Sequence, residues 1–413
     1  MNKRSLRLAA AGLSVVAFAS ACGSSGGKSD AGDTPKTTTT TPAMTADATS
    51  TAAAGLRGTL TGLLDDHVYL AALALTTAVE NGGDLNKPAV KAAVATLDKN
   101  SVALSKAIAS VYPAAEQPFL TSWRQHIGFF VEYTLGKATN NAKRAQKAVT
   151  DLDGYRTSFG QLINSVVPEL PAAAVADELK PHVASLLTTI DSLVAGKADV
   201  FDKLAVAASH MPMTASVLAD GIAKNKKLDG NAMGDAANLR GGLTGLLEDH
   251  VYQAAIAIKF AVAKKGNLND PTVKAAVATL DKNSVALSKA VGAAYPDAEQ
   301  PFLTSWRQHI GFFVEYTLGK ATKDQKRTDK AISDLDGYRT SFGQLINSVV
   351  PELPADAVAE DLKPHVQSLF DAIDAVVAGD TSVFDKVQVA ASHMPMTAAT
   401  LAKGIAANKK ITS

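Results

Sequence analysis

AEQPFLTSWRQHIGFFVEYTLGKAT occupies residues 115–139 and occurs again, letter for letter, at residues 298–322. The same shift of 183 residues superimposes LRGTLTGLLDDHVY (56–69) on LRGGLTGLLEDHVY (239–252), and the register then holds without a gap. The 413-residue chain therefore contains two copies of one domain, 56–224 and 239–407. A polar linker (225–238) joins them and a short tail (408–413) follows. Each copy is long enough to bury its own core.

Each copy is expected to form six helices, arranged as three hairpins of one design. Apolar residues recur at spacings of three and four over long Ala- and Leu-rich stretches, whereas the alternation typical of strands is scarce. Gly, Pro, Asn and Asp interrupt these stretches, as in NGGDLNKP and YPAAEQP. The fold class predicted is all-α, two tandem six-helix bundles. The helices expected in the first copy lie near 56–80, 88–111, 115–139, 141–167, 173–195 and 198–223.

A His or an Asp recurs at one height in every expected hairpin. The first helices carry DDHVY, RQHIG and KPHVA, and the second helices carry LDKN, LDGY and, in the third hairpin, ASHMPMTA (208–215). Because these residues stand at similar distances from the hairpin turns and have apolar neighbours one helical turn away, we expect them to form one buried layer. Its members are His67, Asp98, His126, Asp153, His182 and His210 in the first copy, and His250, Asp281, His309, Asp336, His365 and His393 in the second.

Two interpretations of this layer stay open. Neutral imidazoles and carboxylates that converge from facing helices build metal sites in helical bundles, which predicts one transition-metal ion per copy. The alternative is a hydrogen-bonded polar layer, with His–Asp pairs, that sets the packing register of Ala-rich helices. A compact ligand motif such as HExxH is missing from the sequence.

The ASHMPMTA segment adds a soft ligand to the layer. Met213 shares a helix face with His210, as Met396 does with His393 in the second copy. A thioether together with an imidazole favours copper over zinc or calcium. The alternative is that these methionines fill the core.

Pro181 and Pro212 stand within expected helices of the third hairpin, close to His182 and His210. Each proline removes a backbone donor, so it either bends a continuous helix near the site or marks a place where a helix starts or breaks.

The N-terminus has the pattern of a bacterial lipoprotein signal. Residues 1–21 combine a basic start, a short apolar run and small residues, and Ala19-Ser20-Ala21-Cys22 resembles a lipobox. The resemblance implies that Cys22 carries diacylglycerol. Cys22 is the only cysteine, so it cannot form an internal disulfide; the alternative is an unpaired thiol in a simple signal peptide. Residues 22–55, rich in Gly, Ser, Thr and Ala, are expected to tether the protein to the outer face of the cell membrane.

The charge distribution excludes two classes of partner. The formal net charge is +1, and Lys and Arg are spread along the chain. This pattern indicates neither nucleic-acid binding nor a polybasic membrane patch. The sequence identifies no protein partner.

LDKNSVALSKAI (97–108), WRQHIGFFVEYT (123–134) and HMPMTA (210–215) are similar to a helical domain of secreted proteins of Gram-positive bacteria, some of which are labelled copper amine oxidase-like. The resemblance covers both copies. Copper amine oxidases use a modified Tyr within an Asn-Tyr-Asp/Glu motif, and no Asn-Tyr dipeptide occurs here. The resemblance therefore does not imply an oxidase.

Three functional hypotheses follow. The leading one is a lipid-anchored extracytoplasmic protein that binds a transition metal, copper first, in each copy. The second is a non-catalytic module of the cell envelope whose polar layer is structural. An enzyme ranks third, because no nucleophile elbow or phosphate-binding loop is present in the sequence.

Overall fold

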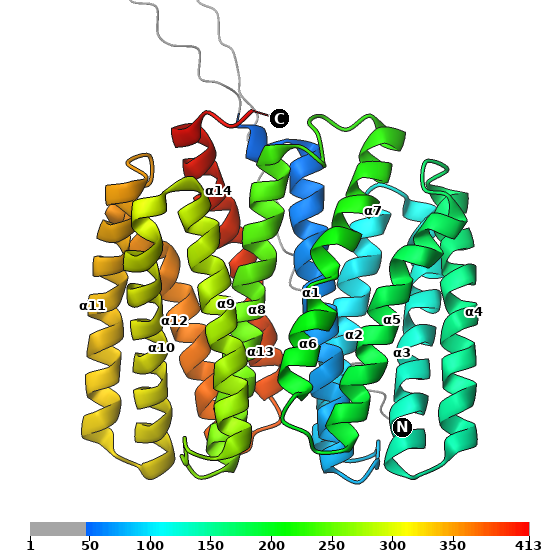
Figure 1. The fold of residues 1–413 in the computed structure, drawn as a ribbon, viewed down its shortest axis with the longest axis horizontal. Helices are drawn as coiled ribbons and strands as arrows, with labels where there is room; N and C mark the ends of the chain where they lie inside the picture. The colour runs from blue at the N-terminus through cyan, green and yellow to red at the C-terminus, as the bar shows by residue number, and fades with distance from the viewer. Residues whose placement is uncertain (1–46, 413) are drawn as a thin grey trace, which may run out of the picture. The chain divides into compact units, whose positions relative to one another are not determined.

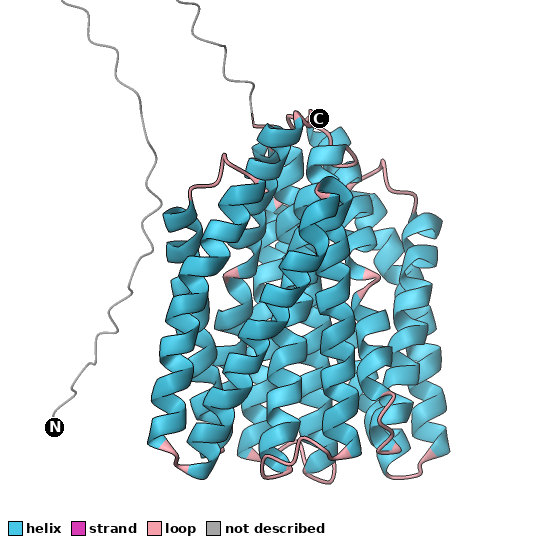
Figure 2. Ribbon diagram, turned by 60° about the vertical axis from the view of Figure 1, so that its left-hand side comes forward, coloured by secondary structure: helices cyan, strands magenta, loops and turns pink. Residues whose placement is uncertain are grey.

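The computed structural model describes residues 47–412, and these residues fold as α-helices joined by short turns, with no β-strand among them (Figure 2). The predicted all-α fold is confirmed. The predicted signal peptide, Cys22 and most of the tether lie outside the described residues.

The helices of the first copy follow the predicted pattern closely. The hairpin partners pack against each other, and the last helix returns to pack along the first. Their bounds are α1 (Ala52–Glu80), α2 (Pro88–Ala109), α3 (Glu116–Ala138), α4 (Ala142–Val166), α5 (Ala172–Val194), α6 (Val200–Ala208) and α7 (Met211–Lys226), with short 3₁₀ turns η1 (Ala48–Ser50) and η2 (Pro113–Ala115).

The second copy repeats this arrangement (Figure 1). Its elements are α8 (Asp235–Ala263), α9 (Pro271–Ala294), η3 (Pro296–Ala298), α10 (Glu299–Thr322), α11 (Gln325–Val349), α12 (Ala355–Ala378), α13 (Val383–Ser392) and α14 (Met394–Lys409).

The sixth predicted helix is two helices. α6 ends at Ala208 and α7 begins at Met211, so Pro212 stands in the first turn of a new helix. Proline is tolerated there, because the first backbone N–H groups of a helix have no intrahelical partner. Pro181, in contrast, lies inside α5, which continues through it. Of the two alternatives for Pro212, the structure shows the helix break.

Local sequence sets the ends of several helices. The Thr51 side chain accepts a hydrogen bond from the Ala54 N–H at the start of α1, and Asn141 does the same for Arg144 at the start of α4. Such caps satisfy N–H groups that a helix leaves free at its first turn. α1 begins at Ala52 and η1 precedes it, so the folded part starts before residue 56, the predicted boundary.

The two copies form one compact unit instead of separate domains on a linker. α1 and α8 lie side by side at the centre of this unit, and α3–α4 and α10–α11 lie at its two sides (Figure 1). The two central helices run parallel, because Arg57 near the start of α1 bonds Asn238 near the start of α8, whereas Glu80 at the end of α1 pairs with Lys259 near the end of α8. One hydrophobic core runs through both copies.

No helix of the described residues is long and apolar enough to cross a membrane.

Candidate functional site

A pair of buried histidines lies inside each copy. His67 on α1 and His126 on α3 place their Nε2 atoms 3.2 Å apart, and both side chains are buried. His250 on α8 and His309 on α10 repeat the pair at the same distance. The prediction that these four residues are buried is confirmed.

Aromatic rings enclose each pair. The Trp123 ring centroid lies 4.8 Å from that of His67 and 4.6 Å from that of His126. Tyr155 from α4 stacks on His126 at 4.9 Å. Trp306 and Tyr338 take the same positions in the second copy. This packing holds the imidazoles in a dry, rigid surrounding.

The other two histidines of each copy extend from this pair toward the surface. His182 on α5 is buried, with its ring 6.5 Å from that of Phe130 between centroids. His210, at the junction of α6 and α7, is half-buried. The electrostatic influence of His210 reaches His182, and that of His182 reaches His126 and His67. The four histidines therefore form a series from the surface to the buried pair, as do His393, His365, His309 and His250.

Burial keeps these imidazoles neutral. It lowers the pKa of His126 to about 3 and that of His182 to about 4, with neighbouring imidazoles as a second cause. The pKa of His67 is also well below its usual value, for the same reasons. A neutral imidazole offers a free nitrogen lone pair, which is the form that binds a metal ion.

The aspartates predicted for the layer are not part of it, and that prediction is wrong. Asp98 lies at the surface, with its side chain 44% exposed, and accepts two hydrogen bonds from Arg124, at 2.6 and 2.8 Å. Asp153 is exposed and pairs with Arg156 on its own helix. An ion pair in water avoids the cost of burying a carboxylate. Asp281 with Arg307 and Asp336 with Arg339 repeat this arrangement in the second copy.

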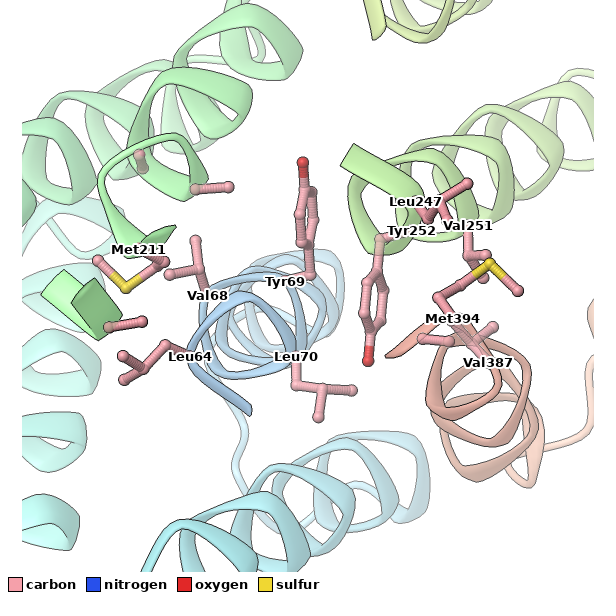
Figure 3. Close-up of a cluster of buried hydrophobic side chains, with 14 of the residues drawn as sticks. Leu64, Val68, Tyr69, Leu70, Met211, Leu247, Val251, Tyr252, Val387 and Met394 are labelled. Atoms are coloured by element: carbon pink, nitrogen blue, oxygen red, sulfur yellow. The ribbon is translucent and has the colours of Figure 1, made fainter. Parts of the chain in front are cut away.

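The methionines predicted as ligands are also misplaced. Met213 is 58% exposed and Met396 is 73% exposed, so neither reaches the buried histidine pair. The buried methionines of the motif are Met211 and Met394, which pack in the core beside α1 and α8 respectively (Figure 3).

The donor set at each pair consists of two imidazole nitrogens. No group of three or more His, Cys, Asp or Glu side chains is arranged to hold a metal ion within residues 47–412. Two nitrogens bound to one tetrahedral ion at about 2.0–2.1 Å would lie about 3.3 Å apart. The observed 3.2 Å is close to this separation, and it is also the length of a hydrogen bond in which one Nε2–H donates to the other Nε2. Imidazole nitrogens suit zinc, copper, iron and nickel, whereas calcium and magnesium require oxygen ligands.

Several polar atoms around the pair lack partners in both copies. Nδ1 of His67, Nδ1 of His182 and Nε1 of Trp123 have no hydrogen-bond partner within the described part of the chain. Buried polar groups are normally hydrogen-bonded, so these atoms are the polar groups of the site that the described part of the protein leaves unsatisfied. The same atoms are unpaired in His250, His365 and Trp306.

Four carboxyl groups, three of them buried and one half-buried, were not predicted from the sequence. Asp65 and Asp66 on α1, and Glu248 and Asp249 on α8, lie between the two copies. Their position directly before the histidines of DDHVY and EDHVY is the sequence feature that could have indicated them. Only the contact between α1 and α8 distinguishes them from surface acids.

No protein-family model, no curated protein and no solved structure matches this chain.

Proposed function

We propose that the protein is a lipid-anchored extracytoplasmic protein in which each copy binds one transition-metal ion, copper first, at its buried histidine pair. The observation that carries the proposal is the convergence of two neutral imidazoles, His67 with His126 and His250 with His309, at 3.2 Å. The lipid anchor rests on the lipobox sequence at Cys22.

The surface residues support copper as the metal. His210 and Met213 stand three residues apart across the start of α7, and Met213 exposes most of its side chain. Although Met213 does not reach the buried pair, a thioether three residues from an imidazole at the start of a helix is a soft ligand set at the surface, which favours copper(I) over harder ions. From there the series of histidines leads inward to the buried pair, so the surface residues would receive the ion and the pair would hold it.

A thermal-unfolding experiment tests the proposal. A ligand that binds only the native state stabilises it, by about 2.7 kcal/mol at a concentration of 100 times its dissociation constant. Copper should therefore raise the unfolding temperature of the protein and leave that of the His126→Ala/His309→Ala variant unchanged. The His210→Ala/His393→Ala variant should still be stabilised, but should load more slowly. Equal responses of all three proteins, or no response, contradict the proposal.

The second candidate is a non-catalytic envelope module in which the histidine layer is structural. The observation that favours it is the absence, within residues 47–412, of a hydrogen-bond acceptor for Nδ1 of His67, because metal-bound histidines usually donate this proton to a carboxylate or carbonyl. This candidate predicts that His126→Ala lowers stability while no added metal restores it.

A further inference from the structure

Two arginines lie close together between the two copies, near the starts of the parallel helices α1 and α8. We call Arg57 and Arg240 the arginine pair; they occupy equivalent positions of the repeat. A Cβ atom on Gly58 of α1 would lie 2.9 Å from Nε of Arg240, and one on Gly241 of α8 would lie 3.1 Å from Nε of Arg57. Each guanidinium therefore lies against the residue that follows the other arginine, which brings two like charges together in the interface.

Hydrogen bonds to the opposite copy hold both side chains in place. Nη1 of Arg57 donates to the Ala232 carbonyl at 2.7 Å and to Oδ1 of Asn238 at 2.5 Å, at the start of the second copy's helix α8. Nη1 of Arg240 donates to the Thr49 carbonyl, in η1 before α1, at 2.9 Å. All three acceptors are uncharged. The hydrogen bonds therefore position the two guanidiniums but do not compensate their charges.

The side of each guanidinium that carries Nε has no protein partner. Nε of Arg57 and Nε of Arg240 are buried, and neither has a hydrogen-bond partner within residues 47–412. An exposed arginine shows what this side binds: Nε and Nη2 of Arg124 donate to the two carboxylate oxygens of Asp98. Such a fork of two N–H groups matches a pair of oxygens on an anion. The arginine pair thus has the geometry of an anion site.

Burial makes the missing charge compensation costly. Arg57 is only 8% exposed and Arg240 is half-buried. Burial lowers the pKa of both arginines, and among the described residues only Asp47, near Arg240, opposes this effect. Asp47 is already engaged, because it accepts hydrogen bonds from the N–H and the hydroxyl of Thr49. A buried charge without a partner destabilises a protein, so a bound anion would remove this cost.

The other carboxyl groups of the region are poorly placed to supply the anion. Asp65 and Glu248 stand eight residues after the arginines on the same helices, about 12 Å along the axis. The arginine side chains extend the other way, toward the end of the unit at which α1 and α8 begin (Figure 1). Asp229 and Asp235, near the start of α8, are exposed, where water and salt screen their charges. The N-terminal ends of two parallel helices add partial positive charge at the same place.

We propose that the arginine pair binds one tetrahedral oxyanion, phosphate or sulfate, between the starts of α1 and α8. A tetrahedral oxyanion offers a pair of oxygens to each of two forks, whereas a carboxylate has only two oxygens in all. The phosphodiester of a lipid headgroup likewise has only two unesterified oxygens, so the free anion fits better. The bound anion would join the two copies, because each arginine already bonds the opposite copy. The proposal does not depend on metal binding at the histidine pairs.

Isothermal titration calorimetry of the purified wild-type protein with sodium phosphate, and separately with sodium sulfate, tests the site directly. We expect one oxyanion per chain. The Arg57→Met/Arg240→Met variant keeps apolar side chains of similar length and removes both charges. Its dissociation constant should be at least about tenfold higher, since the loss of one charge-assisted hydrogen bond has an effect of this size.

The matched control is Arg124→Met/Arg307→Met, which removes one surface arginine from each copy and should bind the oxyanion as the wild-type protein does. Binding of neither phosphate nor sulfate to the wild-type protein overturns the proposal, and this result does not require any variant to fold. Equal binding by the wild-type protein and Arg57→Met/Arg240→Met overturns it as well.

Thermal unfolding tests whether the anion stabilises the joined copies. At equal ionic strength, phosphate should raise the unfolding temperature of the wild-type protein more than chloride does, because a ligand of the native state stabilises it. Phosphate also strengthens apolar burial in any protein, so the variants separate the two effects. The increase beyond that given by chloride should be smaller in Arg57→Met/Arg240→Met than in Arg124→Met/Arg307→Met. Equal increases in these two variants, or an equal effect of chloride and phosphate on the wild-type protein, overturn the proposal.

Discussion

Tyr69 and Tyr252 stack with their ring centroids 5.0 Å apart and their planes only 6° from parallel. Each ring comes from the central helix of one copy, and each hydroxyl bonds an aspartate of the other copy. The stack therefore joins two halves that the sequence repeat alone presents as independent domains.

Tyr69→Phe tests the energy of this contact. The substitution keeps the stacked ring and removes the donor to Asp249. We expect the free energy of unfolding to fall by about 1–3 kcal/mol, with the larger loss at higher pH, because the hydrogen bond favours the ionised form of Asp249. Urea unfolding at two pH values measures this loss of unfolding free energy. Tyr133→Phe, which removes a bond to the more exposed Asp191, is the control, and an equal loss in both variants would argue against a special role for Tyr69.

Substituting alanine for two glycines separates the cost of close helix packing from the gain in helix propensity. Gly62→Ala places a methyl group against Glu248 and Pro395, so we expect a loss of about 1–3 kcal/mol. Gly128→Ala lies in α3 with no neighbour within 4 Å, so it should gain up to about 1 kcal/mol. Thermal unfolding of the two variants gives the signs. A neutral Gly62→Ala would show that α1 and α8 are farther apart than described.

The neutral histidines predict a loss of stability in acid. Their pKa values are lowered in the native state, to about 3 for His126 and about 4 for His182, whereas unfolded histidines titrate near 6.5. Stability is therefore fully present above about 6.5 and decreases as the pH falls toward 4, by up to about 1.4 kcal/mol per pH unit for each histidine.

Burial raises the pKa values of the interface carboxyl groups Asp65, Asp66, Glu248 and Asp249. These groups act in the opposite direction over part of this range, so the comparison needs a variant. In the His126→Gln/His309→Gln variant, the free energy of unfolding should decrease less steeply as the pH falls. Urea unfolding at several pH values measures this slope. An unchanged slope would mean that these two histidines already carry protons in the native protein.

The two tryptophans report on the two histidine pairs separately. The chain has two Trp residues, and each lies within 5 Å of both histidines of one pair, measured between ring centroids. Copper(II) at a pair should quench the adjacent Trp. In a Trp123→Phe background, His309→Ala should abolish quenching of Trp306 and His126→Ala should not. Quenching that survives His309→Ala would place the ion elsewhere.

The helices were predictable because their signals are local. Apolar spacing, prolines and caps such as Thr51 and Asn141 act within a few residues. The burial of His67 and His126 followed from apolar neighbours on their own helices. The same reasoning failed for Asp98, because Val94, one of the neighbours that suggested burial, is itself 43% exposed.

The contact between the copies was not predictable from these local signals. α1 carries buried residues on all sides, including Leu60, Leu64, Val68 and Leu70, and a helix that is apolar all round is fully enclosed. This pattern indicates that α1 packs against a second element, but it does not identify that element. That element is α8. Its identity depends on long-range packing, and so does the burial of Asp65 and Asp66.

The stoichiometry of bound metal is the most direct test of the central claim. The purified protein, stripped with a chelator and dialysed against copper, should retain two ions per chain by elemental analysis. His126→Ala and His309→Ala should each retain one, and the double variant none. Negligible metal in the wild-type protein, or equal metal in all four proteins, would contradict metal binding at the histidine pairs.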